Sequence, residues 1–336
     1  MTFSDLEKMK RLRDCFDLNY RVSRLYAQYL EHYPELICRE MIDALCGDGD
    51  MSREEAIVAI LTEAFALDYD EASDRKIIRD YLVRSVRMLD SKKYTENPYY
   101  KNIKVDNIRS ASWEFKRESY APYRAVVCDD MEFFDGFFEV APLGFFEEEF
   151  SFPAVLEGGN EWMTLTPVDL DTCEDAIAKA HGRVITFGLG LGYFAYMASR
   201  KAEVESVTVI EKSEEIIKLF SEHILPQFES KDKIRIINAD AFEYAEKIMP
   251  SEEYDYAFVD TWRDASDGAP MYKRMKALER LSPCTKFDYW VEGFLVSRLR
   301  AIKFEELWGE CDKDKATTLS YDEICNRLKW ENITDG

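Results

Sequence analysis

Residues 184–194 read VITFGLGLGYF, an apolar run followed by three glycines within five positions. A short apolar run of this kind is typical of a buried β-strand. Glycine after a strand permits positive φ, a tight turn, and close approach of a ligand to main-chain N–H groups at the start of a helix. Gly188, Gly190 and Gly192 therefore predict a strand-to-helix turn that contacts a small molecule. A tight turn without a ligand is the alternative.

The glycine spacing indicates which kind of small molecule to expect. A dinucleotide fingerprint has Gly or Ala at its sixth position, where close helix packing admits a diphosphate. That position here is Tyr193, so the pattern is GxGxG. The loop therefore favours a nucleoside ligand that lacks a diphosphate.

The apolar pattern after Gly182 alternates between strand and helix. The expected strands are RVITFGL at 183–189, SVTVIEK at 206–212, IRIINAD at 234–240, YDYAFVDTW at 254–262 and FDYWVEG at 287–293. Apolar strands separated by helices predict an α/β fold, a Rossmann-like doubly wound and mostly parallel sheet with helices on both faces. Within 301–336 we find no pattern for a further pair of strands.

The remaining segments predict a division into four parts. Residues 1–110 are expected to form a helical N-terminal region and 111–165 a small β-rich element. Residues 166–311 form the Rossmann-like domain, which begins with Thr166 as a helix cap and Pro167 in the first turn. The last part, 312–336, reads as an acidic C-terminal helix.

Acidic residues end three of the expected strands, where ligands bind in parallel sheets. Glu211 ends the second strand and can accept both hydroxyls of a ribose, or else stabilise the helix that begins near Ser213. Asp240 ends the third strand and suits an adenine amino group, with Ala241 beside it, or a plain helix N-cap. Asp260 ends the fourth strand, with a turn or cap as its alternative. Their recurrence at one sheet edge favours a shared ligand.

These motifs resemble the class I S-adenosylmethionine-dependent methyltransferases over roughly residues 165–300, and most closely the spermidine-synthase-like branch. The resemblance implies S-adenosyl-L-methionine as the cofactor. It places the methionine part along Gly188, Leu189, Gly190 and Gly192, the ribose at Glu211 beside Lys212, and the adenine at Asp240 and Ala241. Asp260 would face the same cofactor, and it is also the candidate base for an acceptor that must lose a proton.

The chain differs from several branches of this family at residues that limit which reactions it is expected to catalyse. Leu191 stands where aminopropyltransferases carry an Asp, and Asp260-Thr261-Trp262 lacks their small residues and proline. The segment after 254–262 lacks the tetrad of base amino-methyltransferases, and the end of 287–293 lacks the Asp-Asn pair of metal-dependent relatives, so we expect no metal. We therefore expect a methyltransferase for a small-molecule acceptor. An aminopropyltransferase and a non-catalytic nucleoside-binding or interaction protein remain alternatives.

Composition limits the partners and the location. The formal net charge is −22, from 66 acidic and 44 basic residues, so the field repels nucleic acids. Residues 91–124 are a local exception, which a solvated basic face explains. Eight cysteines without a CxxC pair and three histidines give no zinc spacing. Without an apolar run long enough for a membrane or a signal peptide, we expect a cytoplasmic protein. The oligomeric state stays open, a homodimer included.

Overall fold

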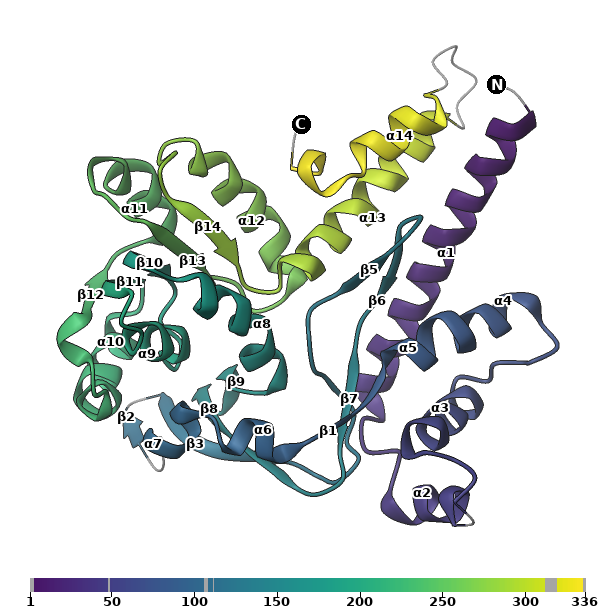
Figure 1. Ribbon diagram of the computed structural model, residues 1–336, viewed down its shortest axis with the longest axis horizontal. Coiled ribbons are helices and arrows are strands. Elements are labelled where there is room, and N and C mark those ends of the chain that lie inside the picture. Colours follow the sequence, from purple (N-terminus) through teal and green to yellow (C-terminus); the bar gives the residue numbers. More distant parts are fainter. Residues whose placement is uncertain (1–2, 48, 106–107, 111, 312–318, 335–336) are drawn as a thin grey trace. The chain divides into compact units, whose positions relative to one another are not determined.

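The computed structural model describes residues 3–47, 49–105, 108–110, 112–311 and 319–334 (Figure 1). The chain divides into two compact units. The first comprises Met1–Asp90, Tyr120–Phe150 and Gly293–Gly336, and the second comprises Ser91–Ser119 and Ser151–Glu292. Each unit is therefore assembled from segments that are distant in the sequence. Among the described residues, no helix combines the length and apolar character needed to cross a bilayer.

The second unit contains a five-stranded sheet in the order β12-β11-β10-β13-β14, and every neighbouring pair is parallel. The strands are β10 (Gly182–Phe187), β11 (Val204–Glu211), β12 (Ile234–Asn238), β13 (Tyr256–Val259) and β14 (Lys286–Tyr289). Each apolar run that the sequence singled out thus forms a parallel strand. The chain passes from β10 outward to β11 and β12 and then returns to β13 on the other side of β10. This reversal of strand order leaves a crevice at the carboxyl ends of β10 and β13.

Helices connect these strands, as the periodicity predicts. Thr166 is the N-cap of the first of them and Pro167 is its first residue, both as expected. The helices are α8 (Pro167–Lys179), α9 (Tyr193–Ser199), α10 (Glu214–Leu219), the π-helix η2 (Phe220–Ile224), the 3-10 helices η3 (Leu225–Gln227), η4 (Lys231–Lys233) and η5 (Met249–Ser251), α11 (Ala241–Lys247) and α12 (Ala265–Glu279).

A second sheet, in the order β2-β3-β8-β9, has most of its residues in the same unit. Its strands are β2 (Ile108–Ser110), β3 (Trp113–Tyr120), β8 (Phe150–Glu157) and β9 (Asn160–Thr164), preceded by α6 (Ser91–Thr95) and α7 (Pro98–Asn102). β8 and β9 form an antiparallel hairpin. This hairpin leads directly into α8, so β9 enters the unit close to the edge of the parallel sheet.

The first unit is mainly helical. Its helices are α1 (Phe3–His32), α2 (Arg39–Cys46), α3 (Arg53–Ala64), α4 (Ala72–Lys76), the π-helix η1 (Ile77–Leu82), α5 (Val83–Ser85), α13 (Glu292–Cys311, of which Glu292 belongs to the second unit), α14 (Tyr321–Arg327) and the 3-10 helix η6 (Trp330–Asn332). Its short strands are β1 (Val86–Leu89), β4 (Val126–Val127), β5 (Glu132–Phe134), β6 (Phe138–Val140) and β7 (Leu143–Phe146). Among the described residues after 300 there is no strand, in line with the sequence; residues 312–318 of the expected C-terminal helix lie outside the described residues.

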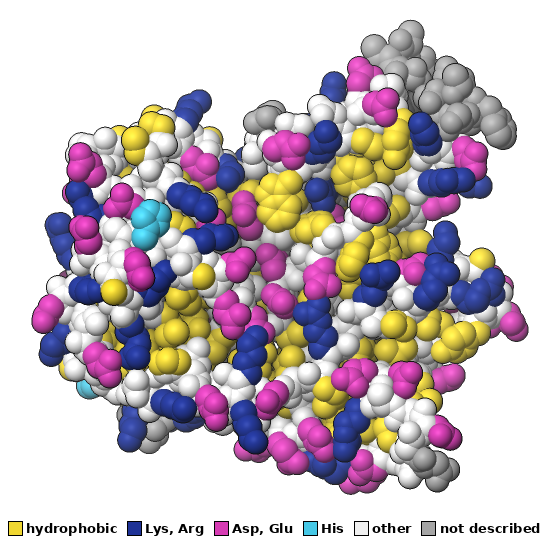
Figure 2. Space-filling view, in the orientation of Figure 1, with side chains coloured by type: hydrophobic (Ala, Val, Ile, Leu, Met, Phe, Trp, Pro, Cys, Tyr) yellow, Lys and Arg dark blue, Asp and Glu magenta, His cyan; other side chains and the backbone are white. Residues whose placement is uncertain are grey.

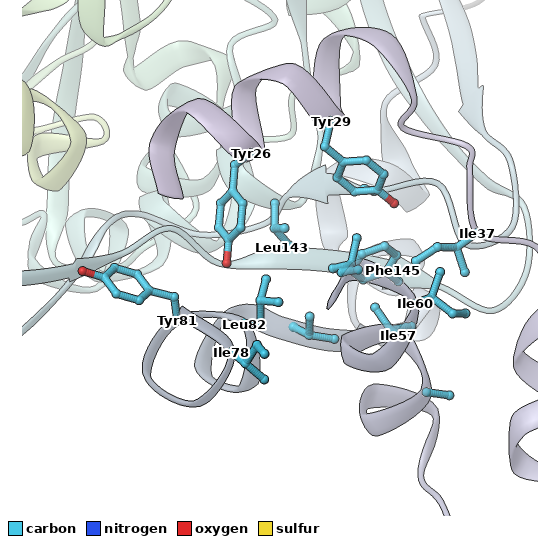
Figure 3. Close-up of a cluster of buried hydrophobic side chains, with 14 of the residues drawn as sticks. Tyr26, Tyr29, Ile37, Ile57, Ile60, Ile78, Tyr81, Leu82, Leu143 and Phe145 are labelled. Carbon is cyan, nitrogen blue, oxygen red and sulfur yellow. The ribbon is translucent and has the colours of Figure 1, made fainter. Parts of the chain in front are cut away.

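The core of this unit gathers apolar side chains from α1, α3, η1 and β7. Figure 3 shows Tyr26 and Tyr29 of α1 pointing toward Leu143 and Phe145 of β7. Ile57 of α3 belongs to the same cluster and is completely buried. The helical spacing of apolar residues in α1 and α3 is therefore explained by burial against a short strand.

We expect Ile57→Ala to lower the free energy of unfolding by about 2–5 kcal/mol, because the substitution leaves a cavity in this core. Urea denaturation followed by circular dichroism measures the change. Glu54→Ala, at an exposed position of the same helix, is the control and should change stability by about 0.5 kcal/mol or less. A similar loss in both variants would contradict the assignment of Ile57 to the core.

Candidate functional site

A cavity of about 500 Å³ lies at the carboxyl ends of the parallel strands. Every residue that lines it belongs to the second unit. The predicted residues on its wall are Gly188, Leu189, Gly190, Glu211, Lys212, Asp240, Ala241 and Asp260. The structure thus brings together the ends of β10, β11, β12 and β13, as the sequence pattern anticipated.

Gly192 has a different place. It adopts a φ of 74° at the N-cap of α9, and it is not part of the cavity wall. A Cβ atom at this position would lie 2.5 Å from the ring of Phe220 and 3.3 Å from that of Phe228. Its requirement for glycine is therefore explained by packing against the η2 region.

The other two glycines are needed by close approaches at the cavity. Gly188 has a φ of +100°, and an added Cβ would lie 1.9 Å from the carbonyl oxygen of Asp260. Gly190 has a φ of +51°, and its Cβ would lie 2.1 Å from the Sδ atom of Met163. The loop therefore lacks side chains at these two positions because the Asp260 carbonyl, which follows β13, and the side chain of Met163 in β9 both approach its main chain.

Glu211 supports this loop from the end of β11. Its Oε2 accepts a hydrogen bond from the Leu189 N–H at 3.1 Å, and its Oε1 accepts one from the Ser213 N–H at 2.7 Å. The carboxylate thus orients the glycine loop and also meets the start of α10, which was the alternative interpretation of this residue. Each carboxylate oxygen has a further lone pair for a ligand.

Asp240 acts as the N-cap of α11. Its Oδ1 accepts hydrogen bonds from the N–H groups of Phe242 and Glu243, at 3.0 and 3.1 Å. Its Oδ2 lies 3.7 Å from the Nζ atom of Lys212. Burial alone would raise the pKa of Asp240, but these N–H donors and the nearby cations hold it below its usual value. The side chain stays ionised at neutral pH and performs the capping role that the sequence left open.

The carboxyl group of Asp260 lies in a more negative electrostatic environment than that of Asp240. Removal from water raises the pKa of its carboxyl to about 8, and the negative charges of Asp169 and Glu211 add to the effect. A carboxyl with such a pKa takes up a proton near neutral pH, which is the property of a general base matched to its working pH.

Sequence reasoning missed Asp169. Its side chain lies in the first turn of α8 and lines the cavity, and burial raises the pKa of its carboxyl to about 6. The spacing from Thr166 to Asp169 is a capping pattern that marks the helix start. That pattern reveals a cap, but it carries no signal that this turn lies beside the end of β13.

Strand β9 supplies a second part of the wall that the sequence did not reveal. Trp162 and Met163 both line the cavity, and the Sδ atom of Met163 accepts a hydrogen bond from the Leu191 N–H at 3.2 Å. The Met163 thioether therefore satisfies the Leu191 N–H, one of the main-chain donors of the glycine loop. Because β9 belongs to another sheet, its position follows from tertiary packing and has no local motif.

The aromatic residues near the loop divide between cavity and core. Trp262 lines the cavity, whereas Tyr193 and Phe194 are buried in α9 away from it. The indole Nε1 of Trp262 and the Oγ1 of Thr261 are buried and have no hydrogen-bond partner among the described residues. Both atoms are buried, so they are unsatisfied polar groups next to Asp260 in the sequence and do not reach the open cavity.

The cavity is strongly acidic. The carboxyl groups on its wall belong to Glu161, Asp169, Glu211, Asp240, Asp260 and Asp267, and the cationic groups belong to Lys212 and Arg263. A low-dielectric cleft lined by one sign of charge concentrates ligands of the opposite sign. Within the described part of the chain, no group of three His, Cys, Asp or Glu side chains has the arrangement of a metal site. The charge of the cavity wall therefore favours a cationic ligand.

The basic segment 91–124 is neutralised locally. Lys93 lies 2.7 Å from a carboxylate oxygen of Asp171, while Arg109 pairs with Glu114 and Lys116 with Glu118. Figure 2 shows Lys and Arg side chains interspersed with Asp and Glu over the visible face. These pairs support the interpretation of the segment as a solvated face.

No family model matches the sequence. No curated protein matches it either. Solved structures with partial similarity include a precorrin-8w decarboxylase from Methanobacterium thermoautotrophicum, at 20% identity over 32% of this chain and 53% of that chain, with a TM-score of 0.25. A Klebsiella pneumoniae protein described as an O-methyltransferase gives 18% identity over 33% and 48%, with a TM-score of 0.26.

A human methyltransferase 10 domain containing protein gives 12% identity over 34% of this chain and 58% of that chain, also with a TM-score of 0.26. The chain spans about half the length of each of these structures. TM-scores of this size do not establish a shared fold.

We expect Gly188→Ala to destabilise the protein more than a positive φ alone explains, because its Cβ would overlap the Asp260 carbonyl. Gly159→Ala is the matched control, since Gly159 has a φ of +84° and nothing within 4 Å of an added Cβ. The control should lower the free energy of unfolding by about 1–2 kcal/mol. Gly188→Ala should lower it by roughly 1–3 kcal/mol more. Equal losses in urea denaturation would show that this contact is not tight.

Proposed function

We propose that this protein is an S-adenosyl-L-methionine-dependent methyltransferase that acts on a small-molecule acceptor. The observation that carries the proposal is one cavity at the reversal of strand order, bounded by Gly188 and Gly190 on one side and by Glu211, Asp240 and Asp260 on the others. Parallel α/β sheets bind ligands at this place. The family resemblance of the same residues supports the assignment.

The residues present fit this cofactor. The volume of about 500 Å³ lies within the range of small-molecule sites. A Cβ atom at Gly188 or Gly190 would overlap its neighbours, so the cradle needs a bare main chain. The surplus of carboxyl groups suits a sulfonium cation and disfavours the diphosphate of a dinucleotide.

Each part of the cradle has a proposed role. Gly188, Leu189 and Gly190 would hold the methionine part, and the free lone pairs of Glu211 would accept the ribose hydroxyls. Asp240 and Ala241 would contact the adenine, with Lys212 at the rim. Gly192 would contribute by fixing the start of α9 and not by contact with the ligand.

When bound, S-adenosylmethionine supplies an electrophilic methyl group, which bonds to a lone pair of the acceptor while the electrons of the carbon–sulfur bond stay on sulfur. The protein must hold the acceptor in line and exclude water, a matter of positioning. The carboxylate of Asp260 would take the proton that the acceptor loses.

A second candidate, aminopropyl transfer to an amine, is favoured by two specific observations. The loop donor at Leu191 is already bonded to Met163, and the acidic cavity disfavours the carboxylate of an intact methionine group. A decarboxylated cofactor avoids both conflicts. Parallel assays with the two cofactors and a polyamine acceptor distinguish the reactions, because only aminopropyl transfer requires the decarboxylated form.

Titration calorimetry with S-adenosylhomocysteine tests the shared premise of both reactions. We expect saturable binding to the intact protein and at least about tenfold weaker binding by Gly190→Val, whose side chain would meet Met163 and fill the cradle. A tenfold loss corresponds to about 1.4 kcal/mol. Binding without turnover under any assay would instead support a nucleoside-binding protein without catalytic activity. No binding at millimolar concentration would contradict the methyltransferase. The aminopropyltransferase would be contradicted if decarboxylated S-adenosylmethionine also failed to bind.

We expect Asp260→Asn to reduce the turnover number by roughly 10²–10⁴-fold, the usual contribution of a general base, with little change in S-adenosylhomocysteine affinity. In the unmodified protein, turnover should rise with pH and level off above about 8, because the base must be deprotonated. Glu253→Gln is the control, at a side chain that is 93% exposed and outside the cavity. A flat pH profile would show that Asp260 is not the base.

A further inference from the structure

A second, smaller chamber adjoins the cavity behind the glycine loop. Its volume is about 20 Å³, and it shares Asp169, Asp260 and Gly188 with the wall of the main cavity. Thr186 and Cys173 also line it. A volume of this size holds one water molecule when several polar groups surround it. The two carboxyl groups therefore border the same small space, whose wall also contains apolar side chains such as Leu165 and Phe258.

Asp169 is fixed in this position by the start of α8. Its Oδ2 accepts hydrogen bonds from the Thr166 N–H at 2.7 Å and from the Thr166 hydroxyl at 2.8 Å. The residue is 9% exposed. These two hydrogen bonds orient the Asp169 carboxylate at the wall of the chamber.

The charged groups around Asp260 come from several elements. Asp169 on α8 and Glu211 at the end of β11 are the carboxyl groups that raise its pKa after burial. The Cys173 thiol, also on α8, stays protonated because burial and the carboxyl groups of Asp260 and Asp169 raise its pKa. The other charged residues on the cavity wall are Glu161, Lys212, Asp240, Arg263 and Asp267. Asp169 is thus the acid that shares both the chamber and the cavity with Asp260.

We propose that Asp169 is a positioning residue that keeps a proton on Asp260 across this chamber and so sets the pH at which Asp260 becomes a base. The pair holds its proton preferentially on Asp260, because burial and the neighbouring carboxylates raise its pKa further than burial raises that of Asp169. In turnover, Asp260 first releases this proton to solvent water and then accepts the one that the acceptor loses. The catalytic consequence rests on the proposed function, whereas the coupling between the two carboxyl groups does not.

The test is ¹³C NMR titration of aspartate side-chain carboxyl groups, with Asp260 assigned by its loss in Asp260→Asn. Asp169→Asn is the decisive variant, because its amide oxygen can still accept from Thr166 while the charge is removed. We expect the pKa of Asp260 to fall by about one unit or more, since a like charge nearby disfavours ionisation. The rising limb of the turnover profile should move to lower pH by the same amount.

Two controls separate this effect from the capping role of Asp169. Asp171→Asn removes a charge from the same helix, but Asp171 pairs with Lys93 and does not line the cavity, so Asp260 should titrate as before. Thr166→Val removes a capping hydrogen bond and keeps the carboxyl group of Asp169, whose pKa rises further without this donor, so the comparison is made at a pH well above 6. If Asp169 served only the helix, Thr166→Val would reproduce the effect of Asp169→Asn.

Each outcome has a distinct meaning. An unchanged titration of Asp260 in Asp169→Asn would overturn the inference, even if methyl transfer is demonstrated. A shifted titration in a protein without turnover would keep the coupling and remove the proposed function. If Asp169→Asn does not fold, the unmodified protein still decides, because Asp260 must then titrate well above an ordinary aspartate and in two steps. A single step near pH 4 would overturn the proposal.

Discussion

The candidate site depends on one close approach, that of Gly188 to the carbonyl oxygen of Asp260. β10 and β13 are parallel neighbours, and the chain reaches them from opposite directions of the sheet. Their ends can lie this close only because Gly188 has no Cβ and adopts a φ of +100°. The reversal of strand order at β10 and β13 leaves the crevice, and residues at the ends of β11 and β12 also line it. The close approach thus fixes the geometry of the two central strand ends at the cavity.

The side chains then give the cavity its charge. Glu211 and Asp240 hold hydrogen bonds from main-chain N–H groups, which offset part of the cost of placing carboxylates in a partly buried site. For Asp260 and Asp169 the cost of burying a charge exceeds the favourable interactions, so the pKa values of both carboxyl groups are raised. A cationic ligand would offset part of this cost. The uncompensated negative charge in the empty cavity therefore favours both ligand binding and proton transfer.

The sequence predicts those parts of the site that depend on local patterns of residues. Glycines at a strand end and acids such as Glu211 and Asp260 are visible because apolar runs mark where parallel strands stop, and parallel strands stop at one edge. Asp169 and Met163 were not visible, because they enter from a helix start and from a strand of another sheet. The sequence of the helical segments does not predict that distant parts of the chain form one unit, because the association of these parts depends on long-range packing.

The most direct test is a crystal structure of the full chain with S-adenosylhomocysteine. The account predicts the adenosyl group in the cavity between β10 and β13, with ribose hydroxyls donating to Glu211, the adenine beside Asp240, and the sulfur facing Asp260. Density for the ligand at another surface, or a ligand in this cavity with Glu211 and Asp260 directed away from it, would contradict the account.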